Sequence, residues 1–197
     1  SAGKTTQGDY AVAVGISSGE TTQGDYAVAL GYNAGTTSQG DEATAVGDSA
    51  GKTNQGANAT AVGDSAGKTT QGASAVAVGQ QAGETTQGTQ AVAVGIYAGY
   101  TGQGAGAVAV GSAAGYTTQG RDTVAIGNQA GTTAQGEYGI AIGSSAGETN
   151  QAANSIVLNA TGSAVQNTTA SSLVIKPIRS AAMTTILGYN AGTGEVT

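Results

Sequence analysis

The sequence of 197 residues contains no cysteine, histidine, tryptophan or phenylalanine, and only one proline. A chain without cysteine has no disulfide framework. Without histidine and cysteine it also lacks the commonest nucleophiles, general bases and zinc ligands. Its acidic residues stand at variable positions and form no carboxylate pair in an apolar setting. These absences predict a protein that is not an enzyme and that binds no metal or cofactor.

Charge and long apolar runs are scarce as well. Only 9% of the residues are charged, the net charge is −6, and the six basic residues are scattered along the chain. Such a charge distribution is a poor electrostatic footprint for nucleic acid or for an anionic membrane surface. No apolar run approaches the roughly 18–20 residues of a transmembrane helix. We therefore expect no nucleic-acid partner and no insertion into a membrane.

The chain does contain 35 glycines and a motif that returns every sixteen residues. A fixed short period with glycine at set offsets is typical of a β-solenoid, in which one repeat forms one coil. Alanine and valine are too small to fill the wide core of a globular domain. The period is marked without a slip by one glutamine per repeat: Gln7, Gln23, Gln39, Gln55, Gln71, Gln87, Gln103, Gln119, Gln135 and Gln151.

Each repeat holds two short extended segments, residues 5–7 and 11–14 in the first, with glycines at the corners between them. Neighbouring coils are expected to pair as parallel strands about 4.8 Å apart. The sequence thus predicts an all-β fold, a parallel β-roll or solenoid of ten sixteen-residue coils over residues 1–159. The chain begins at Ser1 in mid-repeat, as expected of a fragment or a processed form.

We call the same position in successive coils a column and name it by its first member. Alternate residues of a strand face opposite sides, so the Ala13 column and the Val12 and Val14 columns point apart. An unbroken alanine column suits a narrow interior, which leaves the aliphatic columns outside as a stripe that needs a partner. The predicted core and subunit-interface columns include Ala13, Ala45, Ala77, Ala109, Val14, Val46, Val78, Val110, Ile126 and Ile142.

The other extended segment carries a uniform Thr5 column two residues ahead of the Gln7 column. This spacing predicts that the two columns share one face of the strand, with the variable Thr6 column on the other. Glutamine amides stacked at about 4.8 Å can hydrogen-bond to one another along the stack. We therefore expect the glutamines to form a structural ladder.

Two patterns that resemble ligand sites are better explained by the repeat. Residues 47–53 (Gly-Asp-Ser-Ala-Gly-Lys-Thr) resemble a phosphate-binding loop but have three residues, not four, before the Gly-Lys pair. Asp9, Asp25 and Asp41 form an acidic column that could attract a cation. The chain lacks the glycine-aspartate nonapeptide of calcium-binding β-rolls, so a solvated acidic strip is the preferred interpretation.

Tyrosines in the variable columns are the candidate receptor contacts. An exposed tyrosine combines an apolar ring with a hydrogen-bonding hydroxyl and suits contacts with sugars or proteins. The alternative is simple packing between tyrosines of adjacent coils. The candidates are Tyr10, Tyr26, Tyr97, Tyr100 and Tyr116. Three Asn-x-Ser/Thr sequons, at Asn58, Asn159 and Asn167, matter only in a glycosylating compartment.

The period breaks after Gln151, and residues 160–172 are aperiodic and rich in Ser, Thr, Asn and Ala. Residues 171–180 then carry the only proline. No heptad pattern for a coiled coil is present. We expect residues 160–197 to be a separate, short β-rich neck.

The Ala-Val-Ala-Val-Gly and Gln-Gly elements of the repeat resemble the head repeats of trimeric autotransporter adhesins, and residues 121–127 (Arg-Asp-Thr-Val-Ala-Ile-Gly) come closest. The resemblance covers roughly residues 1–159. It implies a left-handed parallel β-roll, three of which pack side by side as a homotrimer. The sixteen-residue period departs from the shorter coils of those heads.

The tail resembles a different family. Leu-Val-Ile-Lys-Pro-Ile-Arg at 173–179 and the segment 186–197 look like the region that precedes the self-cleaving intramolecular chaperone of viral and phage fibres. This resemblance implies a matured chain that ends at Thr197, where the chaperone was removed. Such a trimeric domain would keep three near-identical repeat chains from pairing out of register.

Three functions remain open at this point. The preferred hypothesis is an extracellular attachment fibre on a virion, which presents a surface to a host glycan or protein. The first alternative is the head of a trimeric adhesin on a bacterial surface. The second is ice binding by regular threonine columns, although Thr-Thr-Gln lacks two outward threonines separated by one residue.

Overall fold

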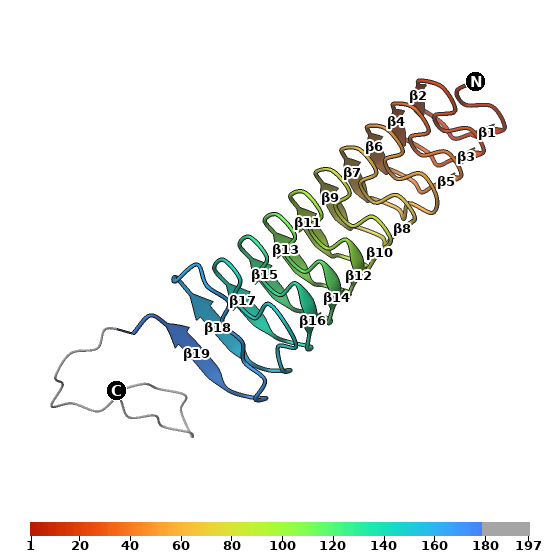
Figure 1. The fold of residues 1–197 in the computed structure, drawn as a ribbon. Coiled ribbons are helices and arrows are strands. Elements are labelled where there is room, and N and C mark those ends of the chain that lie inside the picture. The colour runs from red at the N-terminus through yellow and green to blue at the C-terminus, as the bar shows by residue number, and fades with distance from the viewer. Residues whose placement is uncertain (179–197) are drawn as a thin grey trace, which may run out of the picture.

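The structure is a computed structural model that describes residues 1–178, and these residues form strands and turns only. Because they contain no helix, the described residues offer no helical segment that could cross a bilayer. Successive coils stack into a rod with the N-terminus at one end and the last described coil at the other (Figure 1). The predicted all-β parallel solenoid is confirmed, whereas its left-handed winding stays a prediction.

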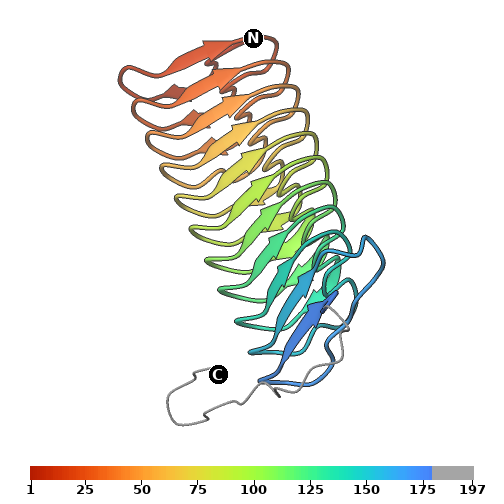
Figure 2. The ribbon, with the colours of Figure 1, turned by 90° about the vertical axis from the view of Figure 1, so that its left-hand side faces the viewer.

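One side of the rod is a single parallel sheet of eleven strands. Its strands pair in register with a sixteen-residue offset, for example Val12 with Val28 and Val92 with Val108. Figure 2 shows this continuous sheet along the rod. The strands are β2 (Val12–Val14), β4 (Val28–Leu30), β6 (Thr44–Val46), β7 (Thr60–Val62), β9 (Val76–Val78), β11 (Val92–Val94), β13 (Val108–Val110), β15 (Val124–Ile126), β17 (Ile140–Ile142), β18 (Ile156–Asn159) and β19 (Leu173–Lys176).

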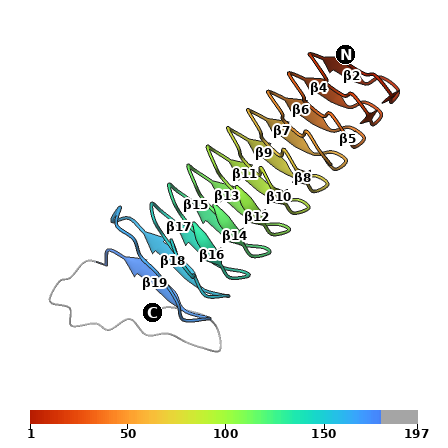
Figure 3. The same cartoon turned by 45° about the vertical axis from the view of Figure 1, so that its right-hand side comes forward.

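The opposite side consists of shorter strands in two parallel sheets, of three and five strands. Between them, Gln55 makes only isolated bridges to Gln39 and Gln71. Figure 3 shows both sides of the rod. The strands are β1 (Thr6–Gln7), β3 (Thr22–Gln23), β5 (Ser38–Gln39), β8 (Thr70–Gln71), β10 (Thr86–Gln87), β12 (Thr101–Gln103), β14 (Thr117–Gln119) and β16 (Thr133–Gln135).

The core between the two sides is built almost entirely from alanine. Ala45, Ala77 and Ala109 of the Ala13 column are fully buried, as are Ala34, Ala50 and their equivalents in the corner column. Val12 and Val14 are 46% and 53% exposed on the outer face of the long sheet. The predicted division into inward alanines and outward aliphatics is confirmed by this burial, and Val157 takes the inward position in the tenth coil.

The glutamine column points into the core and joins its two sides. Gln23 Nε2 donates to Val12 O (2.8 Å) and to Ala27 O (3.2 Å). Val12 is the first residue of β2, and Ala27 directly precedes β4. The same pair of bonds recurs in nearly every coil, for example from Gln71 to Thr60 O and Ala75 O. These glutamines are 1–3% exposed from Gln23 to Gln151. Each amide therefore cross-links the layers of the roll.

The predicted amide ladder needs correction. Side-chain bonds between neighbouring glutamines, such as Gln39 to Gln55 at 3.1 Å, occur at three steps of the described column. The two N–H groups of most amides are already taken by backbone carbonyls, and six of the Oε1 atoms have no donor within hydrogen-bond distance. In Gln23 the Oε1 atom instead faces Gly19, where an added Cβ would approach it to 2.6 Å.

The Thr5 column also departs from the prediction, because it does not share the face of the buried glutamines. Thr21 and Thr37 are exposed, whereas Gln23 and Gln39 are buried. The short strands begin after these threonines, at Thr22 and Ser38, so the threonines occupy the bend that leads into the strand. Strict alternation holds only within a strand, and these strands are mostly two residues long.

Both corners of a coil are β-turns with a left-handed third residue. In residues 24–27, Ala27 N donates to Gly24 O (3.3 Å) and Tyr26 has a φ of 56°. In residues 63–66, Ser65 occupies the same conformation with a φ of 56°. Type II turns favour glycine or asparagine at this position. Stacking offsets the strain, since Tyr26 N donates to Asp9 O of the preceding coil (2.8 Å).

The long sheet continues past residue 159, where the separate neck was expected to begin. Strand β19 pairs with β18 in register from Ile156–Leu173 to Asn159–Lys176. Asn167 takes the place of the glutamine and donates to Ile156 O (3.4 Å) and Ser172 O (3.2 Å). Residues 160–176 therefore form an eleventh coil with a longer loop. The remainder of the expected neck, residues 179–197, lies outside the described residues.

Removing one glutamine amide tests its structural role. We expect Gln71→Met to lower the free energy of unfolding by about 2–3 kcal/mol, because two carbonyls lose their donor inside the roll. The exposed Gln80→Met is the matched control and is expected to change it by under about 0.5 kcal/mol. Guanidinium denaturation measures both values, and equal midpoints for the two variants would contradict the assignment.

Two adjacent alanines separate backbone strain from packing. Ala113 has a φ of 54°, so Ala113→Gly is expected to stabilise the fold by about 1 kcal/mol. Ala114 is fully buried without a positive φ, and Ala114→Gly is expected to destabilise the fold by a similar amount. Thermal unfolding of the two variants should shift in opposite directions, and a shift in the same direction would refute this explanation.

Candidate functional site

The structure divides the candidate tyrosines into two separate groups. Tyr10 and Tyr26 stack with ring centroids 5.0 Å apart and planes at 13°. Tyr100 and Tyr116 stack at 4.9 Å and 9°. The predicted packing between adjacent coils is therefore confirmed for both pairs. Whether any of these tyrosines contacts a receptor stays a prediction.

Tyr97 joins the second pair to form what we call the tyrosine cluster: Tyr97, Tyr100 and Tyr116. Its ring lies 5.7 Å from Tyr100 and 6.1 Å from Tyr116, at interplanar angles of 80° and 74°. Tyr97 is the left-handed residue of its corner turn, with a φ of 58°. The equivalent residues of the other coils, such as Gln81 and Ala113, share this conformation, so the turn and not the ring sets the backbone here.

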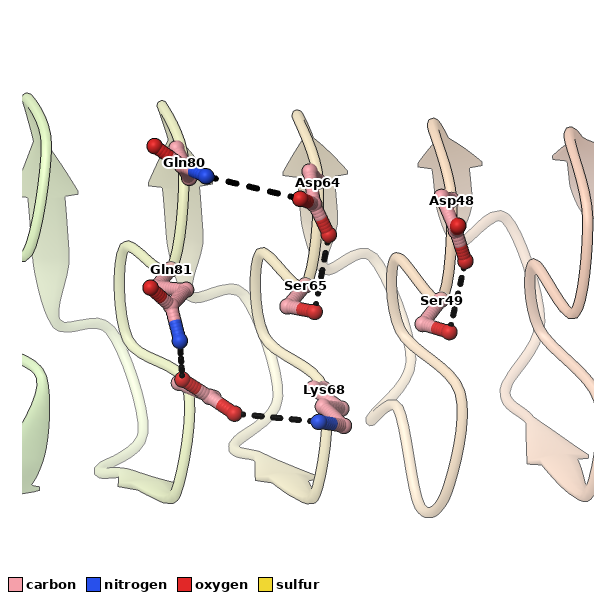
Figure 4. Close-up of polar contacts among 8 residues, drawn as sticks. Asp48, Ser49, Asp64, Ser65, Lys68, Gln80 and Gln81 are labelled. Carbon is pink, nitrogen blue, oxygen red and sulfur yellow. Dashed lines mark hydrogen bonds and ion pairs between the residues drawn. The ribbon is translucent and has the colours of Figure 1, made fainter.

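A fixed carboxylate lies against the tyrosine cluster. Glu84, 8% exposed, accepts from Lys68 Nζ (3.1 Å) and from Gln81 Nε2 (2.7 Å). Figure 4 shows Gln81 and Lys68 pointing toward the carboxylate between them, with Gln80 beside Gln81 in the same turn and Asp64 at the equivalent position of the preceding coil. The negative charge of Glu84, together with burial, raises the pKa of the Tyr100 hydroxyl, which therefore remains a protonated donor at neutral pH.

No role was predicted for Lys68, Gln81 and Glu84, although the sequence contains a signal for them. Glu84 and Lys68 precede Tyr100 in one column by one and two repeats, and Gln81 precedes Tyr97 by one repeat. Stacked coils bring such positions into contact. The tyrosines were compared only with residues of their own columns. Tyr97 lies in the Ser1 column and Tyr100 in the Lys4 column, so the contact between these two columns was missed.

The acidic column has a structural explanation. The backbone N–H of Asp9 donates to Asp25 Oδ1 (2.8 Å), and that of Asp25 donates to Asp41 Oδ1 (3.1 Å). The carboxylates of Asp25 and Asp41 thus each accept from an otherwise unbonded N–H at a turn of the preceding coil. Within residues 1–178, no group of three or more acidic residues is arranged to hold a metal ion.

The three sequons differ in accessibility. Asn159 and Asn167 are 5% and 3% exposed, and their amides donate to backbone carbonyls, Asn159 to Ser144 O and Ser163 O and Asn167 to Ser172 O. Asn58 is exposed at a corner turn and donates to Glu42 Oε2 (2.9 Å). Of the three, only Asn58 presents its amide to an enzyme acting on the folded chain.

The outer face of the long sheet carries the predicted aliphatic stripe. Ile126 and Ile142 are 39% and 40% exposed, and Val46, Val78 and Val110 are half-buried. We define the aliphatic stripe as the outward side chains of the Val12 and Val14 columns. Thr44 and Thr60 interrupt the Val12 column, whereas the Val14 column stays aliphatic beside them, with Val46 and Val62. Contiguous exposed apolar surface of this kind marks an interaction site.

The charge of Glu84 can be tested through the pKa of Tyr100. We expect Glu84→Gln to lower this pKa toward the ordinary value of 10.0, because the phenolate no longer faces a carboxylate. Glu20→Gln is the control, since Glu20 pairs with Lys4 far along the same column. Titration of the ring carbon beside the hydroxyl, followed by NMR, measures the shift. An unchanged Tyr100 pKa in Glu84→Gln would contradict the assigned cause.

Comparison with known proteins gives one match. Two segments, residues 23–50 and 119–146, match the family model described as YadA head domain repeat. The second segment contains residues 121–127, which the sequence analysis singled out. No curated protein and no solved structure gave a significant match. The chain therefore contains two copies of a repeat similar to that of YadA heads, embedded in a uniform solenoid.

Proposed function

We propose that this chain is the head segment of an adhesin-type surface fibre, non-enzymatic and extracellular, in which three copies pack side by side. The observation that carries the proposal is the match of two segments to the YadA head repeat within one continuous solenoid. The resemblance to trimeric autotransporter adhesins favours a bacterial surface. The rod holds its variable corner columns outward, where a host glycan or protein can reach them.

The trimer is proposed from the contrast between the two sides of the rod. The long sheet presents the aliphatic stripe, with Val12, Val14 and Leu30 from 44% to 53% exposed. The other side presents threonine and serine, among them Thr22, Ser38 and Thr86. Burial of aliphatic surface contributes roughly 25 cal/mol per Å². Association through the stripe is therefore the favourable way to cover it, and the polar side stays in water.

A viral or phage attachment fibre is the second candidate. It is favoured by residues 173–179, which resemble the segment before a self-cleaving chaperone. Most of that tail lies outside the described residues. The reading frame of the parent gene distinguishes the candidates, because a membrane-anchor barrel after residue 197 supports the adhesin and a chaperone domain supports the fibre.

Ice binding is less well supported by the arrangement of the threonines. In β3 and β10 the glutamine points inward, so each short strand presents one outward threonine, at Thr22 and Thr86. That row is broken by Asn54, Gly102 and Ala134 in other coils. A thermal hysteresis assay of the purified chain tests this alternative directly.

Charge placed on the aliphatic stripe tests the trimer. We expect Val78→Glu/Val94→Glu to sediment as a monomer, because each buried carboxylate costs about 3–5 kcal/mol without a partner. Thr70→Glu/Thr86→Glu places the same charges on the polar side of neighbouring coils and is expected to remain trimeric. Sedimentation velocity decides the matter, and a wild-type monomer or a trimeric Val78→Glu/Val94→Glu variant would contradict the proposal.

A further inference from the structure

The tyrosine cluster is a local departure from the repeat. In the Ser1 column, the positions equivalent to Tyr97 hold Ser17, Asn33, Ser49, Ser65, Gln81, Ala113, Gln129 and Ser145. In the Lys4 column, the positions equivalent to Tyr100 and Tyr116 hold Lys4, Glu20, Thr36, Lys52, Lys68, Glu84, Thr132 and Glu148. Aromatic residues thus enter these two corner columns at one place only. The fold does not require aromatic residues at these positions, since the other coils form without them.

The three rings present apolar surface that solvent reaches. Tyr97 is 37% exposed, and Tyr100 and Tyr116 are partly exposed. Stacking holds Tyr100 and Tyr116 parallel, and Tyr97 lies beside both at nearly the same distance. Because each ring is fixed by two others, little side-chain entropy is lost when a ligand covers them.

Hydrogen-bonding groups surround these rings. The amide of Gln81 and the carboxylate of Glu84 are joined at 2.7 Å, and Lys68 balances the charge of Glu84 at 3.1 Å. The phenol of Tyr100 beside Glu84 is a donor at neutral pH. Apolar ring surface next to fixed donors and acceptors, whose opposite charges balance, suits a ligand with both C–H faces and hydroxyl groups.

We propose that Tyr97, Tyr100 and Tyr116, together with Gln81 and Glu84, form a binding subsite for neutral oligosaccharides. This inference rests on the proposed function, since it names the ligand class of the adhesin surface. Acidic glycans are disfavoured, because the chain has a net charge of −6 and Lys68, the cation beside the cluster, is already paired with Glu84. Cationic ligands are disfavoured because Lys68 already neutralises Glu84.

Tyr10 and Tyr26 provide an internal comparison. They are 78% and 60% exposed and stack as Tyr100 and Tyr116 do. Among residues 1–178 no third ring contacts this pair, and the nearby Asp25 and Asp41 carboxylates accept from backbone N–H groups of the turns. Two exposed rings without fixed polar neighbours do not make the same site, so this pair serves as the control.

The repeat itself supplies substitutions that the fold tolerates. The cluster variant combines three substitutions, Tyr97→Asn, Tyr100→Thr and Tyr116→Thr. They install the residues found at Asn33, Thr36 and Thr132 of the same columns. The control variant, Tyr10→Asn/Tyr26→Asn, installs the residue found in the same column at Asn58 and Asn154. Asparagine also tolerates the left-handed conformation better than tyrosine. Both variants are therefore expected to keep the fold and the oligomeric state of the wild type.

The experiment applies the wild-type protein and both variants to an array of neutral and acidic oligosaccharides. We expect the wild type to bind neutral oligosaccharides, and the cluster variant to lose at least about tenfold in affinity for them. The Tyr10→Asn/Tyr26→Asn control is expected to stay within about twofold of the wild type. A wild type that binds only acidic glycans, or a cluster variant that binds neutral ones unchanged, would overturn the inference.

Sedimentation and adherence to cultured cells, measured on the same samples, separate this inference from the proposed function. A wild-type trimer that adheres to cells but binds no oligosaccharide overturns the carbohydrate subsite and leaves the adhesin proposal standing. Loss of that adherence in the cluster variant would then identify a protein contact at the same residues. A wild type that is monomeric and does not adhere overturns the proposed function itself.

Discussion

The bond from each buried glutamine amide to two backbone carbonyls is the interaction on which the structure depends. It ties the short strands to the long sheet once per coil, as Gln23 does with Val12 and Ala27. It also joins the two layers, and the core beside it is alanine in all but the last coils, where Val157 and Val165 take part. A polar amide can serve as the centre of a core because its donors are satisfied there. The eleventh coil keeps this arrangement with a shorter side chain, Asn167.

The interior is closed by alanine and glutamine, and the corner glycines leave no room for a Cβ between coils. The remaining outward positions of a coil are free to serve outside contacts. The long sheet carries the aliphatic stripe, which suits other copies of the chain. The corner turns carry variable side chains, and the backbone at the corners is held by bonds between coils, as between Tyr26 N and Asp9 O. A fixed backbone with interchangeable corner residues can therefore change its ligand without changing its fold. The tyrosine cluster is one such local exchange, over two coils.

Much of this fold could be predicted, because a strict period assigns each position to the same environment in every coil. The inward alanines and the outward aliphatics followed from alternation within the strands. Alternation failed at Thr21 and Thr37, since the short strands begin only after them. The break of period after Gln151 suggested a boundary, but Asn167 and Val165 continue the coil with different residues. The contact between Tyr97, Tyr100 and Glu84 crosses two columns, and only the geometry of the corner reveals it.

The central claim is that the aliphatic stripe is an interface between copies of the chain and that the threonine side faces water. Methyl-labelled protein with a soluble paramagnetic agent tests this most directly, by comparing the valine methyls of the Val14 column with the threonine methyls of the short strands. We predict that the methyls of Val78 and Val110 are shielded, although they are half-buried in the single chain, and that those of Thr70 and Thr86 are strongly relaxed. Equal relaxation of both sets would contradict the claim.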